Sequence, residues 1–130
     1  MNYEQLIGLT NTAEDFVTEK NTALALGSGS LNVFATPALI RLVEIAAAQL
    51  VEKNIPPEST SVGISLNIKH TAPTPLNMNV RAVVKVIAVD GRKIVFEVVA
   101  FDECGEIGRG VHERFIVNRE KFQAKADSRS

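Results

Sequence analysis

The spacing of apolar residues changes along the chain, and each change marks a predicted element. From about Pro37 to Lys53, apolar residues recur every three or four positions in a run rich in Ala and Leu. This spacing predicts an amphipathic helix. Thr36 is a favourable N-cap, Pro37 suits the first helical position, and Asn54 with Pro56-Pro57 follows the end of the pattern. A long helix with one apolar stripe is therefore expected.

A two-residue period predicts β-strands in the second half of the chain. The clearest strand carries alternating residues that share one face, namely Val62, Ile64, Leu66, Ile68 and His70. Three further strands are expected over about residues 77–89, 93–101 and 107–117, and Asp90-Gly91 is a strong hairpin turn between the first two of these.

The remaining segments complete the predicted order. A first strand is expected within Glu14 to Leu26, before a flexible loop over Gly27-Ser28-Gly29-Ser30. The tail from Lys121 to Ser130 is polar and is expected to be frayed. The order of one strand, one long helix and four strands joined by short turns predicts an α+β domain, with the helix buried on one face of an antiparallel sheet of about five strands. We expect a single domain over residues 1–130.

Composition excludes several classes of protein. Hydrophobic residues make up 45% of the 130 residues, enough for one core, and the net charge of -1 gives no basic surface for nucleic acid. Cys104 is the one cysteine, which excludes an intrachain disulfide and any cysteine-based metal cluster. No run approaches the roughly 20 apolar residues of a membrane span, and Met1 to Leu9 does not resemble a secretory signal. The expected location is the cytoplasm.

Three polar residues in unusual settings are candidates for chemistry, and each has a simpler interpretation. His70 is either a buried structural histidine or a general acid or base. Glu44 is either a solvated helix charge or a partly desolvated carboxylate flanked by apolar residues. Thr36 is either an ordinary N-cap or a hydroxyl beside free backbone N–H groups, where developing negative charge is stabilised.

The chain resembles the fluoroacetyl-CoA thioesterase branch of the hotdog superfamily. The resemblance runs from Val33 to Phe122 with consistent spacing. It is carried by the blocks Val33-Phe34-Ala35-Thr36, Leu42-Val43-Glu44, His70-Thr71-Ala72 with Thr74-Pro75, Asp90-Gly91-Arg92, Glu106-Ile107-Gly108, His112-Glu113-Arg114-Phe115 and Glu120-Lys121-Phe122. It implies a hotdog fold, in which a curved antiparallel sheet wraps a long central helix. It also implies hydrolysis of an acyl-CoA without a metal or a cofactor, CoA being part of the substrate.

The resemblance also implies roles for particular residues. A catalytic set falls on Thr36, Glu44 and His70, and substrate-binding positions fall on Gly63, Phe34 and Val33. Eight residues of helix separate Thr36 from Glu44 by roughly 12 Å, so the two side chains cannot be hydrogen-bonded from one straight helix. Three arrangements stay open: His70 lies between them, the Thr36 segment folds back as a loop, or the partners come from two subunits. The resemblance implies the last of these, a homodimer with the site at the subunit interface. Either Thr36 or a water molecule, the latter activated by His70 or by Glu44, is the nucleophile.

Two features bear on specificity and on rival functions. In the fluoroacetyl-specific enzyme the segment before the catalytic threonine is an aromatic-bearing lid, whereas Leu26 to Ser30 is small and flexible, so no strong fluoroacetyl preference is expected. An enoyl-CoA hydratase of this superfamily usually carries an Asp-x-Asn-Pro-x-His loop, which is missing from the sequence. A non-catalytic acyl-CoA-binding protein and a structural dimerisation protein are two further functions with which the pattern is compatible.

Overall fold

The computed structural model describes residues 2–130. A 3₁₀ turn (Glu4–Leu6) precedes the main elements. In chain order these are β1 (Thr10–Phe16), α1 (Ala23–Leu26), α2 (Thr36–Glu52), β2 (Ser59–His70), β3 (Asn79–Asp90), β4 (Lys93–Asp102), β5 (Gly105–Asn118) and α3 (Arg119–Asp127).

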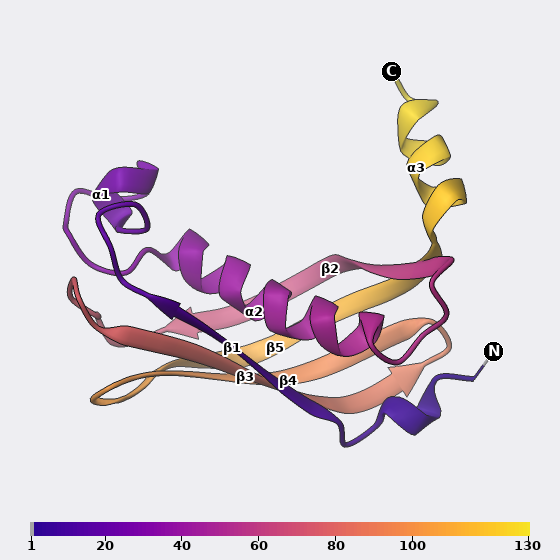
Figure 1. Ribbon diagram of the computed structural model, residues 1–130, viewed down its shortest axis with the longest axis horizontal. Helices are drawn as coiled ribbons and strands as arrows, with labels where there is room; N and C mark the ends of the chain where they lie inside the picture. Colours follow the sequence, from indigo (N-terminus) through magenta and orange to yellow (C-terminus); the bar gives the residue numbers. More distant parts are fainter. Residues whose placement is uncertain (1) are drawn as a thin grey trace.

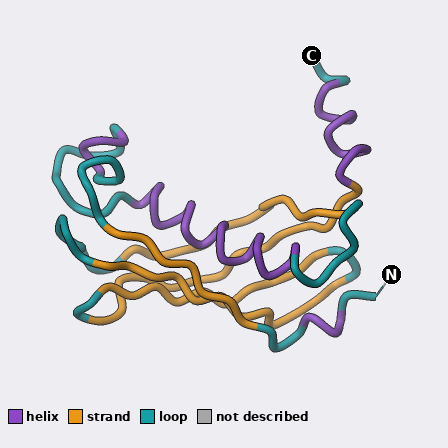
Figure 2. Tube along the Cα trace, in the orientation of Figure 1, coloured by secondary structure: helices purple, strands orange, loops and turns teal. Residues whose placement is uncertain are grey.

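The five strands form one antiparallel sheet in the order β1-β3-β4-β5-β2. The sheet curves around α2, which crosses one of its faces along most of its length (Figures 1 and 2). This is the helix-and-sheet arrangement predicted from the sequence. Because β2 and β1 are the outer strands, each leaves one side without a backbone partner in the described chain.

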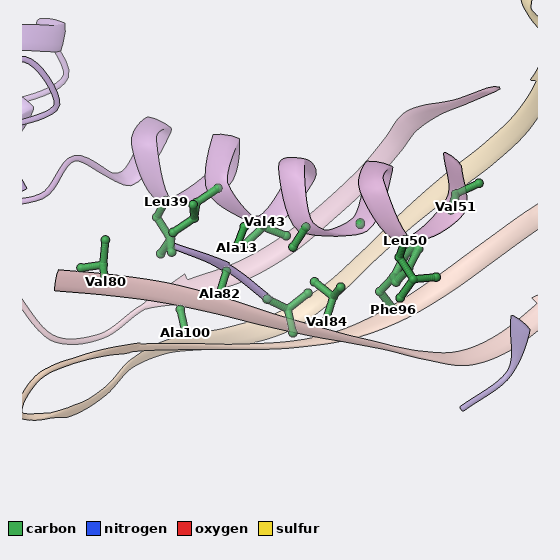
Figure 3. Close-up of a cluster of buried hydrophobic side chains, with 14 of the residues drawn as sticks. Ala13, Leu39, Val43, Leu50, Val51, Val80, Ala82, Val84, Phe96 and Ala100 are labelled. Atoms are coloured by element: carbon green, nitrogen blue, oxygen red, sulfur yellow. The ribbon is translucent and has the colours of Figure 1, made fainter. Parts of the chain in front are cut away.

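The core lies between the apolar stripe of α2 and the inner face of the sheet (Figure 3). From α2, Leu39, Val43 and Leu50 are buried, and they meet buried residues of the sheet that include Val84 and Phe96. Fully burying a side chain of this size stabilises the fold by roughly 1.5–3 kcal/mol. The stripe thus fixes which face of α2 turns inward, and Glu44 lies outside it.

Two expectations for the first part of the chain are wrong. The first strand begins earlier, at Thr10, and ends at Phe16, and the segment Ala23–Leu26 is a helical turn instead of the end of a strand. The hydroxyl of Thr22 accepts a hydrogen bond from the Ala25 amide and caps this turn, which ends at Gly27 with φ 70°. A local cap and a glycine in the left-handed region therefore decide the conformation.

The loop at residues 27–30 is hydrogen-bonded to its surroundings. The amide of Ser28 donates to the carbonyl of Ala23, and the amides of Ala23 and Leu24 donate to the carbonyls of Val33 and Leu31. The glycine and serine content of the segment predicted a loop correctly, but these hydrogen bonds give the loop a defined path.

A β-bulge in β2 corrects the predicted pattern of faces. The register with β5 shifts between Gly63 and Ser65, so one extra residue lies in β2 at this point. Ser61 is buried, whereas Ile64 is 50% exposed. The prediction that Val62 and Ile64 share the face of His70 is therefore wrong. Ile64 is the extra residue itself, and Val62, which precedes it, lies on the opposite face.

The predicted frayed tail forms the helix α3. The side chain of Asn118 accepts a hydrogen bond from the Lys121 amide and caps the helix. α3 leaves the end of β5 and projects away from the sheet, and none of its residues is buried (Figure 1). Polar composition therefore predicted exposure correctly but not the secondary structure.

Candidate active site

Thr36 and His70 meet where the start of α2 lies beside the end of β2. The Thr36 Oγ1 lies 2.8 Å from the His70 Nδ1. The N-cap of α2 is Ala35, which has no side-chain cap hydrogen bond, so the expectation that Thr36 caps the helix is wrong. The hydroxyl that was expected to bind the helix backbone is hydrogen-bonded to an imidazole instead.

The environment of His70 favours the neutral imidazole. The ring is half-buried, and its burial lowers the pKa of His70 from the ordinary value of 6.5. The Phe34 ring lies beside it in a T-shaped arrangement, with the two ring centroids 6.4 Å apart and the ring planes at 78°. Within residues 2–130 the buried Nε2 has no hydrogen-bond partner. A neutral imidazole whose Nδ1 accepts the Thr36 hydroxyl proton is arranged as a base for that hydroxyl.

A pocket of about 340 Å³ opens onto this pair. Its lining includes four of the predicted site residues, Val33, Phe34, Thr36 and His70. The remainder of the wall comes from the α1 segment and from the residues after β2: Ala23, Ser28, Thr71, Ala72 and Pro73. The fold therefore brings these four predicted positions to one cavity.

Glu44 and Gly63 form a second cluster. The Glu44 Oε2 accepts a hydrogen bond from the Arg114 Nη1 at 3.2 Å. Arg114 is buried and also donates to the hydroxyl and the carbonyl of Ser61. A Cβ added at Gly63 would collide with the Glu44 carboxylate. Gly63 is therefore the residue whose lack of a side chain leaves room for Glu44 against the sheet.

His112 also belongs to this second cluster and contacts Arg114. It is fully buried and stacks on Phe96, with ring centroids 5.9 Å apart. Its Nδ1 lies 2.9 Å from the carbonyl of Ser65 and its Nε2 lies 3.2 Å from the Arg114 Nη1. A carbonyl can only accept, so Nδ1 carries the proton and Nε2 accepts from Arg114. Burial is the main cause that lowers the pKa of His112 from 6.5.

Arg114 and His112 had no predicted role, although both lie in a block that carries the resemblance. The sequence did carry a signal, because His112, Arg114 and Ile116 alternate with other residues along the predicted last strand. The structure shows that all three are buried. An arginine on a buried strand face requires a partner, and Glu44 is the carboxylate that it reaches.

The two clusters are not joined within one chain. In the part of the chain that the structure describes, no hydrogen bond connects Glu44 to His70 or Thr36. The predicted Thr–Glu–His set is thus divided into a Thr36–His70 pair with the pocket and a Glu44 cluster that comprises Glu44, Ser61, Gly63, His112 and Arg114.

The described residues offer no constellation for a metal ion and no membrane-spanning helix. Over residues 2–130, no group of three or more His, Cys, Asp or Glu residues is placed to hold a metal ion. No helix in the same range is long and apolar enough to cross a membrane. The expectation that the reaction needs no cofactor stays a prediction.

Comparison with known proteins identifies the family. The family model described as FlK, fluoroacetyl-CoA-specific thioesterase, matches residues 17–120. The chain is also 37% identical over 93 residues to a fluoroacetyl-CoA thioesterase of Streptantibioticus cattleyicolor, covering 72% of this chain and 67% of that protein. The chain belongs to the FlK thioesterase family. This confirms the resemblance and the enzyme class, a thioester hydrolase.

Solved structures agree with membership of the FlK family. A structure of the fluoroacetyl-CoA thioesterase FlK superposes with a TM-score of 0.89 at 30% identity, covering 95% of this chain and 96% of that one. A hot-dog-like protein from Thermanaerovibrio acidaminovorans gives a TM-score of 0.90 at 22% identity, covering 99% and 97% of the two chains. The second likeness bears on the fold alone, and together they confirm the hotdog fold.

Proposed function

We propose that this FlK-family enzyme hydrolyses an acyl-CoA to the free acid and CoA, as a homodimer in which each active site draws on both subunits. The observation that carries the proposal is the division of the predicted catalytic residues into two clusters. The Thr36–His70 pair lines the pocket, while Glu44 is held against Gly63 by Arg114. A second copy of the chain can supply to each cluster the groups that it lacks.

The exposed edge of β2 is the proposed contact between subunits. It carries Ile64 and Leu66, which are 50% and 38% exposed. Two copies of β2 related by a two-fold axis pair in antiparallel orientation, so residues equally far from the axis lie opposite each other. An axis near Leu66 and Asn67 would place His70 of one subunit opposite Gly63 of the other, which brings the Glu44 cluster to the partner's pocket.

The proposed chemistry follows from the Thr36–His70 contact. The 2.8 Å separation favours transfer of the Thr36 hydroxyl proton to His70 Nδ1 as Oγ1 attacks the thioester carbonyl. The thiolate of CoA leaves and takes that proton, and water then hydrolyses the ester on Thr36 to release the acid and restore the hydroxyl. The free backbone N–H groups at the N-terminus of α2 and the backbone of Gly63 stabilise the negative charge that develops on the carbonyl oxygen. The Glu44 side chain of the other subunit balances the positive charge that forms on His70.

A complementation experiment tests the shared site. The variants His70→Ala and Glu44→Ala are co-expressed with different affinity tags, and the mixed dimer is isolated by two purification steps. Each parent homodimer is expected to lose turnover by about a hundredfold or more, the usual scale for a lost acid–base group. The mixed dimer should recover about half of the wild-type turnover, because one of its two sites then contains both intact residues.

The matched control is the mixed dimer of His70→Ala with Thr36→Ala. Thr36 and His70 belong to the same subunit's cluster, so both sites of this dimer are defective and no recovery is expected. Recovery in the control, or inactive mixed dimers of His70→Ala with Glu44→Ala, would contradict a site divided in this way.

The proposed enzyme has no strong preference for fluoroacetyl-CoA. Ala23 and Ser28 are the contributions of residues 22–30 to the pocket wall, and both side chains are small. The aromatic contact beside His70 is Phe34, which precedes α2 and is itself buried. A wall of this kind leaves room for acyl groups larger than acetyl. The proposed location is the cytoplasm, where the exposed free thiol of Cys104 would stay reduced.

A further inference from the structure

A second cavity, remote from the pocket, lies between α3, the end of β5 and the β3–β4 hairpin. Its volume is about 190 Å³, and its lining residues are Arg92, Val117, Asn118, Lys121, Phe122 and Lys125. The proposed hydrolysis leaves all six without a role. Three of them are cations and none is an acid, which is unusual in a chain of net charge -1.

The positive charge of this cavity is not balanced by the fold. Lys121 and Lys125 are four residues apart, so they lie on one face of α3. At about 100° per residue, the acidic residues of α3, Glu120 and Asp127, lie on the opposite face. In residues 2–130 the salt bridges involve Lys93, Arg109, Arg114 and Arg119, and none involves a cation of this cavity. Like charges held close together attract an anion.

An aromatic ring lies among these cations. Phe122 lines the cavity and is 41% exposed. The chain has six phenylalanines, so an exposed one at this place is notable. An exposed aromatic ring beside Lys and Arg side chains is a surface on which a nucleobase stacks while its phosphates contact the cations. The chemistry of the cavity therefore matches a phosphorylated nucleoside better than a simple anion.

We propose that this cavity binds the phosphorylated adenosine part of CoA, with the phosphates on Arg92, Lys121 and Lys125 and the adenine on Phe122. The inference rests on the proposed function, since it names the position of the nucleotide end of the same substrate.

The distance from the cavity to the proposed active site suits this ligand. Asn118, at the base of α3, pairs with Ser59 at the start of β2, four residues before Gly63. Four strand residues span roughly 13 Å. In the proposed dimer the partner's Thr36–His70 pair lies close to Gly63. The pantetheine arm of CoA has the length of an extended chain of four to five residues, roughly 15 Å. One CoA molecule can therefore reach from the partner's pocket to this cavity.

The test compares two thioesters with the same acyl group, an acyl-CoA and the matching acyl-pantetheine, which lacks the phosphates and adenosine. For a Lys121→Ala/Lys125→Ala double variant, the KM for acyl-CoA should rise by about tenfold or more, with little change in kcat. Phe122→Ala should raise the same KM by about tenfold, from the loss of stacking. Neither variant should change the KM for acyl-pantetheine. Lys85→Ala, which removes a positive charge from β3, and Gln123→Ala, on the other face of α3, are the controls.

A binding measurement keeps the inference independent of catalysis. Adenosine 3′,5′-bisphosphate should bind wild-type protein in calorimetry, more tightly than inorganic phosphate, and should bind the double variant about tenfold more weakly. The nucleotide site would be overturned if the ratio of the KM for acyl-CoA to the KM for acyl-pantetheine were the same in wild type and in the double variant. Equal binding of the bisphosphate to wild type and double variant would also overturn it. Failure of wild type to hydrolyse either thioester would instead overturn the proposed function, while calorimetry still decides the inference.

Discussion

At the scale of single residues, the acid–base behaviour of His70 gives a direct prediction. Burial lowers the pKa of His70, so the neutral, proton-accepting form persists to lower pH than for an exposed histidine. If His70 is the base, kcat/KM should be level near neutral pH and should fall on the acid side, with an apparent pKa below 6.5. The check is a pH profile of kcat/KM, together with titration of the histidine NMR signals.

The two histidines of the chain can be separated in this experiment. The spectrum of His70→Ala retains the signal of His112 alone, which assigns both resonances. An apparent pKa above 6.5 for the acid side of the kcat/KM profile would argue against a buried neutral base at this position. So would an NMR signal of His70 that titrates above that value.

The residues also show what the sequence could and could not reveal. Thr36, Glu44 and His70 were found because polar groups stand in apolar surroundings and lie in the blocks that carry the resemblance. The spacing rules could not show that the Thr36 hydroxyl binds an imidazole instead of capping α2, because that choice depends on a strand 34 residues later. Arg114 was missed for a similar reason, since its partner Glu44 lies 70 residues away.

At the scale of elements, the sequence predicted helices and strands correctly where the spacing of apolar residues was regular. It failed where a single residue changed the local structure. α2 and the β3–β4 hairpin lie close to their predicted bounds, because a helical stripe and an Asp-Gly turn specify themselves locally. The bulge in β2 is decided by pairing with β5, and its extra residue, Ile64, puts Val62 on the face opposite to that of His70. The cap at Asn118 converts a polar tail into α3, which composition alone did not indicate.

The α1 segment and its loop lead to the prediction on substrate specificity. Discrimination of one fluorine requires close, rigid contacts, and this segment contributes only Ala23 and Ser28 to the pocket. We therefore expect similar kcat/KM values for fluoroacetyl-CoA and acetyl-CoA, and measurable turnover of somewhat larger acyl groups. Side-by-side kinetics of the two substrates provide the check. A preference for the fluorinated substrate above about a thousandfold, roughly 4 kcal/mol in transition-state free energy, would show that other parts of the site supply the selectivity.

At the scale of the whole molecule, a single chain contains each proposed catalytic residue but does not bring them together. The core places α2 along the sheet, so Thr36 lies beside the end of β2 while Glu44 lies two turns further on, above Gly63. Helix geometry read from the sequence already excluded direct contact between Thr36 and Glu44. The sequence could not indicate which strands lie at the edges of the sheet, because that depends on the order of strands in the folded sheet.

The final prediction concerns assembly through β2. The protein should have twice its chain mass of 14.1 kDa by light scattering at micromolar concentration. Leu66 is 38% exposed on β2 and lies near the proposed two-fold axis, where its two copies would approach each other. In Leu66→Lys the two ammonium groups would repel each other at the contact, so we expect a monomer that has lost turnover of acyl-CoA.

The matched control is Ile87→Lys, because Ile87 is 45% exposed on β3, an inner strand, and this variant should remain dimeric and active. Circular dichroism establishes that both variants are folded. A wild-type monomer with full activity, or a folded and active Leu66→Lys monomer, would show that one subunit suffices for catalysis.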